Sequence, residues 1–206
     1  AIMVISFRDS LDDWLIRMLP ADLYLRAAPA GTSGYLEPEE VKQVSLLPGI
    51  AGIRPVRFES LRIGSKGDTI ALIARPITRM GDLPLVAGST SPEGLGTDPP
   101  AWISEVAADR LRLGIGAPLA LPLGERMQTF RVAGIWRDYA RQQGAILIEL
   151  EIYQKLTGDR RVNDLGLYLT AGTDPAGVMS LIRAQFGEGV SELTLPGELR
   201  ALILGV

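Results

Sequence analysis

Apolar residues recur at the period of an α-helix near the start of the chain. Over Ser6–Leu19 they fall three or four positions apart, so one face is apolar and the acidic side chains lie on the other. Pro20 ends this helix. Two beginnings fit the pattern: a capping box formed by Ser6 and Asp9, or a helix that continues backward through Ile2–Ile5. The apolar face comprises Phe7, Leu11, Trp14, Leu15, Met18 and Leu19.

A second helix has both of its ends marked in the sequence. Asp174 is a favourable N-cap, Pro175 suits the first helical position, and Gly187 ends the helix. The stripe that we expect to be buried comprises Val178, Leu181, Ile182 and Phe186.

Shorter apolar runs between turn residues predict the remaining elements. The expected strands are 23–28, 53–63, 69–77, 118–123, 130–136, 145–148, 165–170 and 190–195. The expected helices are 37–47, 105–113 and 152–156, and a further apolar segment occupies 197–206. The three tryptophans, Trp14, Trp102 and Trp136, are expected in the core or at a subdomain interface.

The order strand–helix–strand occurs in the first third of the chain and again in the last third. Two such units around a different middle predict an α+β fold, a split ferredoxin-like α/β sandwich with an inserted small β-rich subdomain. We place the sandwich at 1–77 and 144–206 and the insert at 78–143. Residues 78–100 are rich in Gly, Pro, Ser and Thr. Within them, Leu85–Pro100 is a candidate for partner contact, and a tolerated surface loop is the alternative.

Composition excludes several classes of function. The 206 residues contain no His and no Cys, so Ser-His-Asp chemistry, zinc–thiolate sites and disulfides are excluded. The net charge is −3, with both signs well mixed, and no basic stripe is available for nucleic acid. The chain contains no run of about 18 apolar residues, so no segment of it could span a membrane by itself.

Two glycine-rich motifs are interpreted as turns. Gly64–Thr69 lacks the spacing of a phosphate-binding loop and precedes a strand, so it predicts a hairpin turn. Gly31–Gly34 resembles a nucleophile elbow only loosely, and the chain has no His to activate a serine there.

The acidic clusters also lack the geometry of a catalytic or metal site. Asp12-Asp13 and Glu39-Glu40 are adjacent on helices and point about 100° apart, so neither is a converging pair. Glu93 and Asp98 lack the order of a calcium loop. The sequence therefore predicts no catalytic residue, no cofactor-binding residue and no metal ligand.

A set of short stretches, taken in chain order, carries a family resemblance. They are Ser6–Arg8 with Trp14-Leu15, Ala21–Leu25, Val86–Gly88, Ile103–Glu105 with Ala107-Ala108, Leu113–Gly116, Phe130–Ile135 and Tyr153–Asp159. Together they resemble the MacB-like periplasmic core of FtsX-like ABC transporter permeases. Ala117 departs from that pattern, in which Asp is common, and this puts one turn hydrogen bond in doubt.

The resemblance implies a periplasmic, extracytoplasmic domain of an inner (plasma) membrane permease, flanked by transmembrane helices. Ile2–Ile5 would end one membrane helix and Leu202–Val206 would begin the next. The fold implied has a porter-like α/β part and a sabre-like insert. The function implied is non-catalytic mechanotransmission: a cytoplasmic ABC ATPase partner hydrolyses ATP, and the outer domain changes shape to export or release a lipid-like, lipoprotein or peptide cargo, with a periplasmic partner.

Two other classes of function stay open at this point. A carboxylate-based soluble hydrolase would need two carboxylates converging in a deep pocket. A soluble periplasmic binding or scaffold protein would need no link to a membrane.

Overall fold

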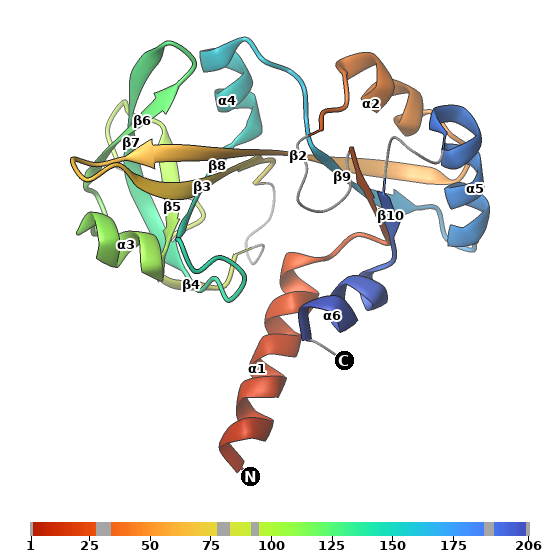
Figure 1. Ribbon diagram of the computed structural model, residues 1–206, viewed down its shortest axis with the longest axis horizontal. Coiled ribbons are helices and arrows are strands. Elements are labelled where there is room, and N and C mark those ends of the chain that lie inside the picture. Colours follow the sequence, from red (N-terminus) through yellow and green to blue (C-terminus); the bar gives the residue numbers. More distant parts are fainter. Residues whose placement is uncertain (1, 28–33, 78–82, 92–94, 188–191, 205–206) are drawn as a thin grey trace. The chain divides into compact units, whose positions relative to one another are not determined.

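The computed structural model describes residues 2–27, 34–77, 83–91, 95–187 and 192–204. The chain forms two compact units, and each contains two separate stretches of sequence. Unit 1 comprises Ala1–Met18 and Phe58–Asp159, and unit 2 comprises Leu19–Arg57 and Arg160–Val206. Strand β2 (Ile50–Ile63) runs from unit 2 into unit 1 (Figure 1).

Unit 2 is the ferredoxin-like half of the chain. Its sheet has the order β10-β1-β9-β2, and all three pairings are antiparallel. In chain order the unit reads strand–helix–strand twice, which confirms the predicted split sandwich. Its other elements are β1 (Leu23–Arg26), α2 (Pro38–Ser45), β9 (Asp164–Leu169), α5 (Pro175–Phe186), β10 (Glu192–Thr194) and α6 (Pro196–Leu204).

Unit 1 contains a mixed sheet with the order β3-β8-β5-β7-β4, to which β6 adds through β7. The pairs β3–β8 and β5–β7 are parallel, whereas β5–β8, β4–β7 and β6–β7 are antiparallel. Its strands are β3 (Asp68–Arg75), β4 (Leu85–Gly88), β5 (Pro100–Ser104), β6 (Pro118–Leu123), β7 (Arg126–Trp136) and β8 (Ala145–Glu149). Its helices are α1 (Ile2–Met18), α3 (Glu105–Leu111) and α4 (Leu150–Thr157).

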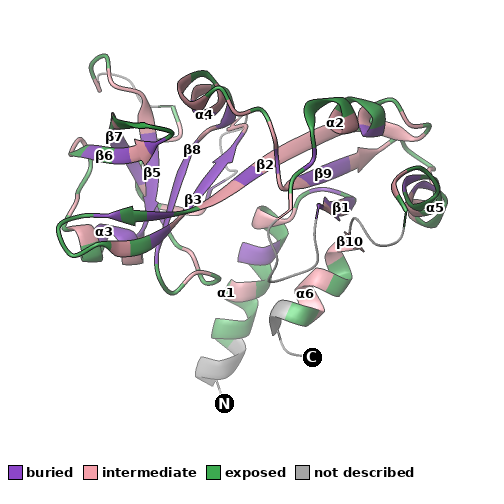
Figure 2. Cartoon of the chain, turned by 45° about the horizontal axis from the view of Figure 1, so that its top comes forward, coloured by how far each residue is buried: buried purple, intermediate pink, exposed green. Residues whose placement is uncertain are grey.

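The core of unit 1 lies in the central strands of this sheet. Every residue of β8 from Ala145 to Ile148 is buried, and so are Ala101, Trp102 and Ile103 of β5 (Figure 2). Trp136 at the end of β7 is completely buried. Strands that are covered on both faces read as continuous apolar runs rather than alternating ones.

The units divide the chain at positions that differ from the predicted boundaries at 77/78 and 143/144. Residues 58–77 and 144–159 belong to unit 1 because β3 pairs with β8, and α4 packs against β3, β6 and β8. Helix α1 also belongs to unit 1, although the next residues of the chain belong to unit 2.

Three local predictions need correction. Helix α1 begins at Ile2, and the Ser6 carbonyl accepts a bond from the Ser10 hydroxyl at 2.9 Å inside the helix, so the Ser6 capping box is wrong. Leu181 is 42% exposed and Phe186 is half-buried, so only Val178 and Ile182 of the predicted α5 stripe are buried. Strand β4 falls within the Gly- and Pro-rich residues 78–100, and β5 begins at Pro100; neither strand was predicted.

Within the described residues, no helix is both long enough and apolar enough to cross a membrane.

Candidate functional site

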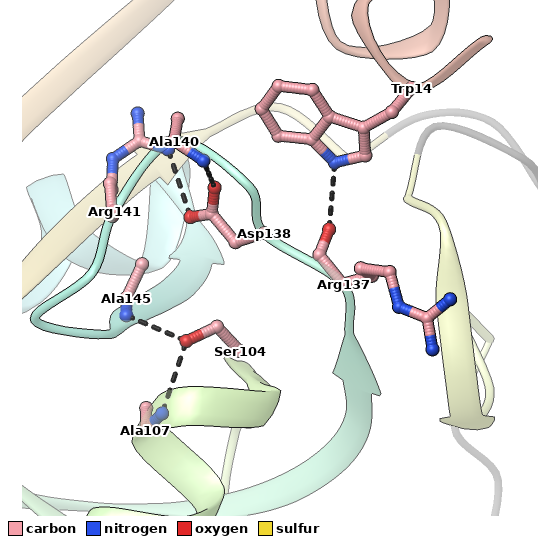
Figure 3. Close-up of polar contacts among 8 residues, drawn as sticks. All are labelled: Trp14, Ser104, Ala107, Arg137, Asp138, Ala140, Arg141 and Ala145. Carbon is pink, nitrogen blue, oxygen red and sulfur yellow. Dashed lines mark hydrogen bonds and ion pairs between the residues drawn. The ribbon is translucent and has the colours of Figure 1, made fainter. Parts of the chain in front are cut away.

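Helix α1 is attached to unit 1 through one tryptophan. The indole Nε1 of Trp14 donates a hydrogen bond to the carbonyl oxygen of Arg137 at 2.8 Å, just after β7 ends (Figure 3). Trp14 is 5% exposed and its neighbour Leu15 is fully buried. Because the indole can only donate a hydrogen bond, its bond to this carbonyl fixes both the orientation of the ring and how deeply the ring is buried.

Tyr139 lies edge-on to two aromatic rings of α1. Its ring centroid is 5.7 Å from that of Trp14 and 5.9 Å from that of Phe7, with interplanar angles of 80° and 83°. Phe7 and Trp14 are two helical turns apart, so one tyrosine contacts the helix at two levels. We call Phe7, Trp14 and Tyr139 the aromatic cluster. Each such pair contributes about 0.5–1.5 kcal/mol beyond area burial.

The loop that carries Tyr139 is held from both sides. Asp138, whose side chain is completely buried, accepts a bond from the Ala140 N–H at 2.9 Å and pairs with Arg141 at 3.2 Å (Figure 3). On the other side, Arg137 pairs with Glu105 at 3.1 Å, and this carboxylate raises the pKa of Arg137. The aromatic cluster therefore joins α1 to a fixed loop.

Ser104 fixes the elements beneath this loop. Its Oγ accepts bonds from the Ala107 N–H at 3.2 Å and from the Ala145 N–H at 2.9 Å, and the residue has no solvent exposure (Figure 3). One hydroxyl thus caps α3 and satisfies the first amide of β8. Helix α3, β5 and β8 are held together at this one atom.

A pocket of about 330 Å³ lies between α1 and β4. Its walls combine aromatic and apolar surface with two guanidinium groups and one carboxylate. The lining residues are Ser10, Asp13, Trp14, Arg17, Pro84, Leu85, Val86, Arg137 and Tyr139. The arrangement offers a recess with a mixed apolar and charged lining beside an exposed strand, and its lining contains one carboxylate rather than a pair.

The structure describes one of the two predicted glycine-rich turns. Gly64–Asp68 forms the hairpin turn between β2 and β3, and the Gly67 N–H donates to the Gly64 carbonyl at 3.1 Å. The predicted turn at Gly31–Gly34 lies outside the described residues except for Gly34. The three tryptophans are all buried core residues of unit 1, as predicted.

Two residues of the predicted acidic clusters, Glu40 and Asp98, have structural roles. Glu40 accepts a bond from the Glu37 N–H at 2.7 Å and so closes the N-terminus of α2. Asp98 pairs with Arg131 at 2.9 Å, and Glu93 lies outside the described residues. Asp13 lines the pocket described above. Among the described residues, no group of three or more acidic side chains is arranged to hold a metal ion.

Burial raises the pKa of one carboxyl group, that of Glu149. Glu149 ends β8 and accepts a bond from the Ile77 N–H at 2.9 Å. Burial is the main cause that raises its pKa, the bond from Ile77 lowers it, and the charge of Glu151 raises it. This carboxyl closes the backbone after β3 and lies outside the pocket lining, so we assign it a structural role.

Glu149→Gln is therefore expected to stabilise the chain at neutral pH by less than about 1 kcal/mol, because the group is only partly buried. The amide oxygen keeps the bond from Ile77, and the charge that burial disfavours is gone. Because the pKa of Glu149 is raised in the folded state, its protonated form favours the native state at a pH below the ordinary carboxyl pKa of 4.5. This contribution to stability is lost as the pH rises through the pKa of the folded state. The variant's advantage should thus disappear in acid. Urea titrations at pH 7 and pH 4 measure it.

Glu125→Gln is the matched control, since Glu125 is an exposed carboxyl in the β6–β7 turn. It should change stability little at either pH. A Glu149→Gln variant that is less stable than the parent at pH 7 would contradict the assignment.

Sequence reasoning did not identify Arg137 and Tyr139. They lie in a short aperiodic loop, 123 and 125 positions from Trp14, and nothing in the neighbouring sequence marks them as partners of the N-terminal helix. The amphipathic period of α1 did predict that Trp14 would be buried.

The fold and this attachment site define a class: a split α/β domain with a second, mixed sheet and an N-terminal helix that packs on the unit of that sheet. The family model of the MacB-like periplasmic core domain matches residues 2–185. The chain belongs to this family, and it is an extracytoplasmic domain of an ABC transporter permease.

One curated relative is an uncharacterized ABC transporter permease protein of Mycobacterium tuberculosis, 27% identical over 210 residues. The match covers 90% of this chain and 23% of the relative, so the chain spans about a quarter of that protein.

Two solved structures show the same fold. The periplasmic region of MacB from Actinobacillus actinomycetemcomitans has a TM-score of 0.63 at 15% identity, covering 93% of this chain and 96% of that one. The extracellular domain of the noncanonic ABC-type transporter YknZ from Gram-positive bacteria has a TM-score of 0.57 at 12% identity, covering 84% and 98%. The expected combination of a porter-like and a sabre-like fold is therefore confirmed.

Proposed function

We propose that this domain transmits movement rather than carrying out catalysis. In this proposal a cytoplasmic ATPase partner hydrolyses ATP, the membrane helices of the parent permease move, and α1 passes the displacement to the extracytoplasmic units. The cargo would be a lipid-like molecule, a lipoprotein or a peptide. We assign no catalytic residue to the chain.

The observation that carries the proposal is the double attachment of α1. The helix is held to unit 1 by the aromatic cluster and by the Trp14–Arg137 bond. It is held to unit 2 by the chain itself, because Leu19 follows directly and leads into β1. A displacement of α1 would therefore act on both units, and it would change their arrangement unless the two responded alike.

The other end of the chain strengthens this argument. Helix α6 belongs to unit 2 and follows β10 after one residue. The helices at the two ends of the chain thus belong to different units. Two membrane helices that moved relative to each other would deliver different displacements to the two units.

Tyr139→Ala is expected to uncouple the units from ATP hydrolysis in the full-length permease with its ATPase. The substitution removes both ring pairs, which together contribute about 1–3 kcal/mol to the docking of α1. Tyr139 is 37% exposed, so the fold should survive. Spin labels at Lys66→Cys in unit 1 and Lys42→Cys in unit 2 report the change, and the domain has no cysteine of its own.

With the parent tyrosine, the distance distribution between the labels should shift when ATP is added. In Tyr139→Ala the shift should be lost while ATP hydrolysis continues. Tyr139→Phe keeps both ring pairs and should behave like the parent. A label distance that ignores ATP in the parent permease would overturn the proposal.

A further inference from the structure

Strand β4 is an open edge of the unit 1 sheet. In the described part of the chain it pairs with β7 on one side and is the last strand in the order (Figure 1). Val86, Ala87 and Gly88 are exposed, Val86 at 45%. An edge strand presents backbone N–H and C=O groups that another extended chain can pair with.

Both ends of this edge are hydrogen-bonded to the rest of unit 1. At one end the Arg137 N–H donates to the Pro84 carbonyl at 3.1 Å. At the other end the Ser89 N–H donates to the Ala133 carbonyl at 3.1 Å, and the indole of Trp102 donates to the Ser89 carbonyl at 2.8 Å. An extended segment that binds here would order little of the protein, which favours affinity.

The edge has no charged side chain to repel a partner strand. Residues 85–91 read LVAGSTS, whereas natural edge strands are commonly guarded by charged residues. Strand β4 is short, and its pairing with β7 has a register shift between Leu85 and Ala87. The edge can therefore pair with only one short segment of a partner.

The pocket lies directly beside this edge, because Pro84, Leu85 and Val86 form one of its walls. Trp14 and Tyr139 form the aromatic part of the lining. Strand addition obtains affinity from main-chain bonds and specificity from pockets that receive alternate side chains. Both elements of that recognition mode are present here within one unit.

We propose that β4 receives an extended segment of an extracytoplasmic partner protein, which adds as a strand and places a large apolar side chain in the pocket. The edge itself selects this occupant. A lipid tail has no groups to pair with the backbone of β4, and a helix has already used its own. The uncharged edge likewise gives no basis for nucleic acid. The proposal does not depend on movement of α1, so it stands or falls separately from mechanotransmission.

The test uses the 206-residue chain and a phage-displayed library of random 12-residue peptides. Enriched peptides should show alternating apolar residues with one large apolar side chain. Val86→Lys places a charge at the edge and in the pocket wall, and it should weaken binding at least tenfold. Met127→Lys is the matched control, because Met127 is an apolar residue 64% exposed on β7, outside the pocket lining, and binding should not change.

The peptide backbone provides a second arm that needs no protein variant. The best peptide is made in two versions, N-methylated at its odd-numbered or at its even-numbered amides, and one of the two versions should no longer bind. In NMR spectra of the chain, the amide shifts caused by the unmodified peptide should centre on residues 85–89. Four results would overturn the proposal: no enriched peptide, binding that ignores both N-methylation phases, β4 shifts that follow the concentration of the chain alone, or the same shifts with phosphatidylglycerol vesicles. The last two would assign the edge to a second copy or to lipid.

Discussion

Replacing Ser104 with alanine should lower the free energy of unfolding by about 2–4 kcal/mol, because one hydroxyl serves two buried amides. Without Oγ, the N–H of Ala107 loses its cap and the N–H of Ala145 loses its side-chain acceptor. Ser104 is fully buried, so water cannot replace the oxygen without a local opening. Urea unfolding followed by tryptophan fluorescence measures the loss.

Asp174→Ala is the matched control for the cap alone. Asp174 caps α5 through one bond to the Ala176 N–H at 3.1 Å in an exposed position. Its loss should cost about 0.5–1 kcal/mol, which is typical of a solvent-exposed cap. Equal losses at the two positions would show that Ser104 acts only as a cap and does not hold β8.

The elements that local rules specify could be predicted well. Helix α5 begins at Pro175, directly after the predicted Asp174 cap, and β6 occupies Pro118–Leu123 as expected. In these segments the cap, the proline or the run of apolar residues acts within a few positions, so the chain alone contains the signal. The order of the elements then led to the ferredoxin-like half.

Strands β4 and β5 could not be predicted in the same way. β5 is five residues long, starts at a proline and ends at the N-cap of α3, so its apolar run is too short to separate from the helix. β4 is four residues long and largely exposed. Each is a strand because its neighbours supply the pairing, and the paired residues lie 31 to 51 positions away in sequence.

The attachment of α1 shows the same limitation more clearly. The amphipathic face of the helix predicted burial of Trp14 but not its partner. That partner is the loop after β7, and the connection is made across more than a hundred residues by a backbone carbonyl and one tyrosine. Every residue has a backbone carbonyl, so the sequence does not show which one accepts the bond, and a lone tyrosine in a loop has many other interpretations. The family resemblance indicated the class of protein, whereas the geometry indicated which residues hold α1 to the loop after β7.

Gly88→Ala should cost about 3 kcal/mol or more and should detach β4 from β7, because two unfavourable effects coincide. Gly88 has a φ of +83°, and an added Cβ would lie 2.2 Å from the Ala133 carbonyl oxygen and 2.6 Å from the Gly134 Cα. Both are backbone atoms of β7, so no side-chain rotation relieves the contact. Hydrogen exchange at the Ser89 amide, whose acceptor is that same carbonyl, should accelerate.

Gly67→Ala separates the two effects. Gly67 has a φ of +66° in the β2–β3 turn, and an added Cβ would meet nothing within 4 Å. It should cost about 1–2 kcal/mol, the strain of a left-handed backbone alone. If Gly88→Ala cost no more than this, β4 would not be held as closely against β7 as the structure shows. A clear excess, with faster exchange confined to Ser89 and its neighbours, would instead establish that the open edge is rigid because a glycine allows β4 to approach β7 so closely.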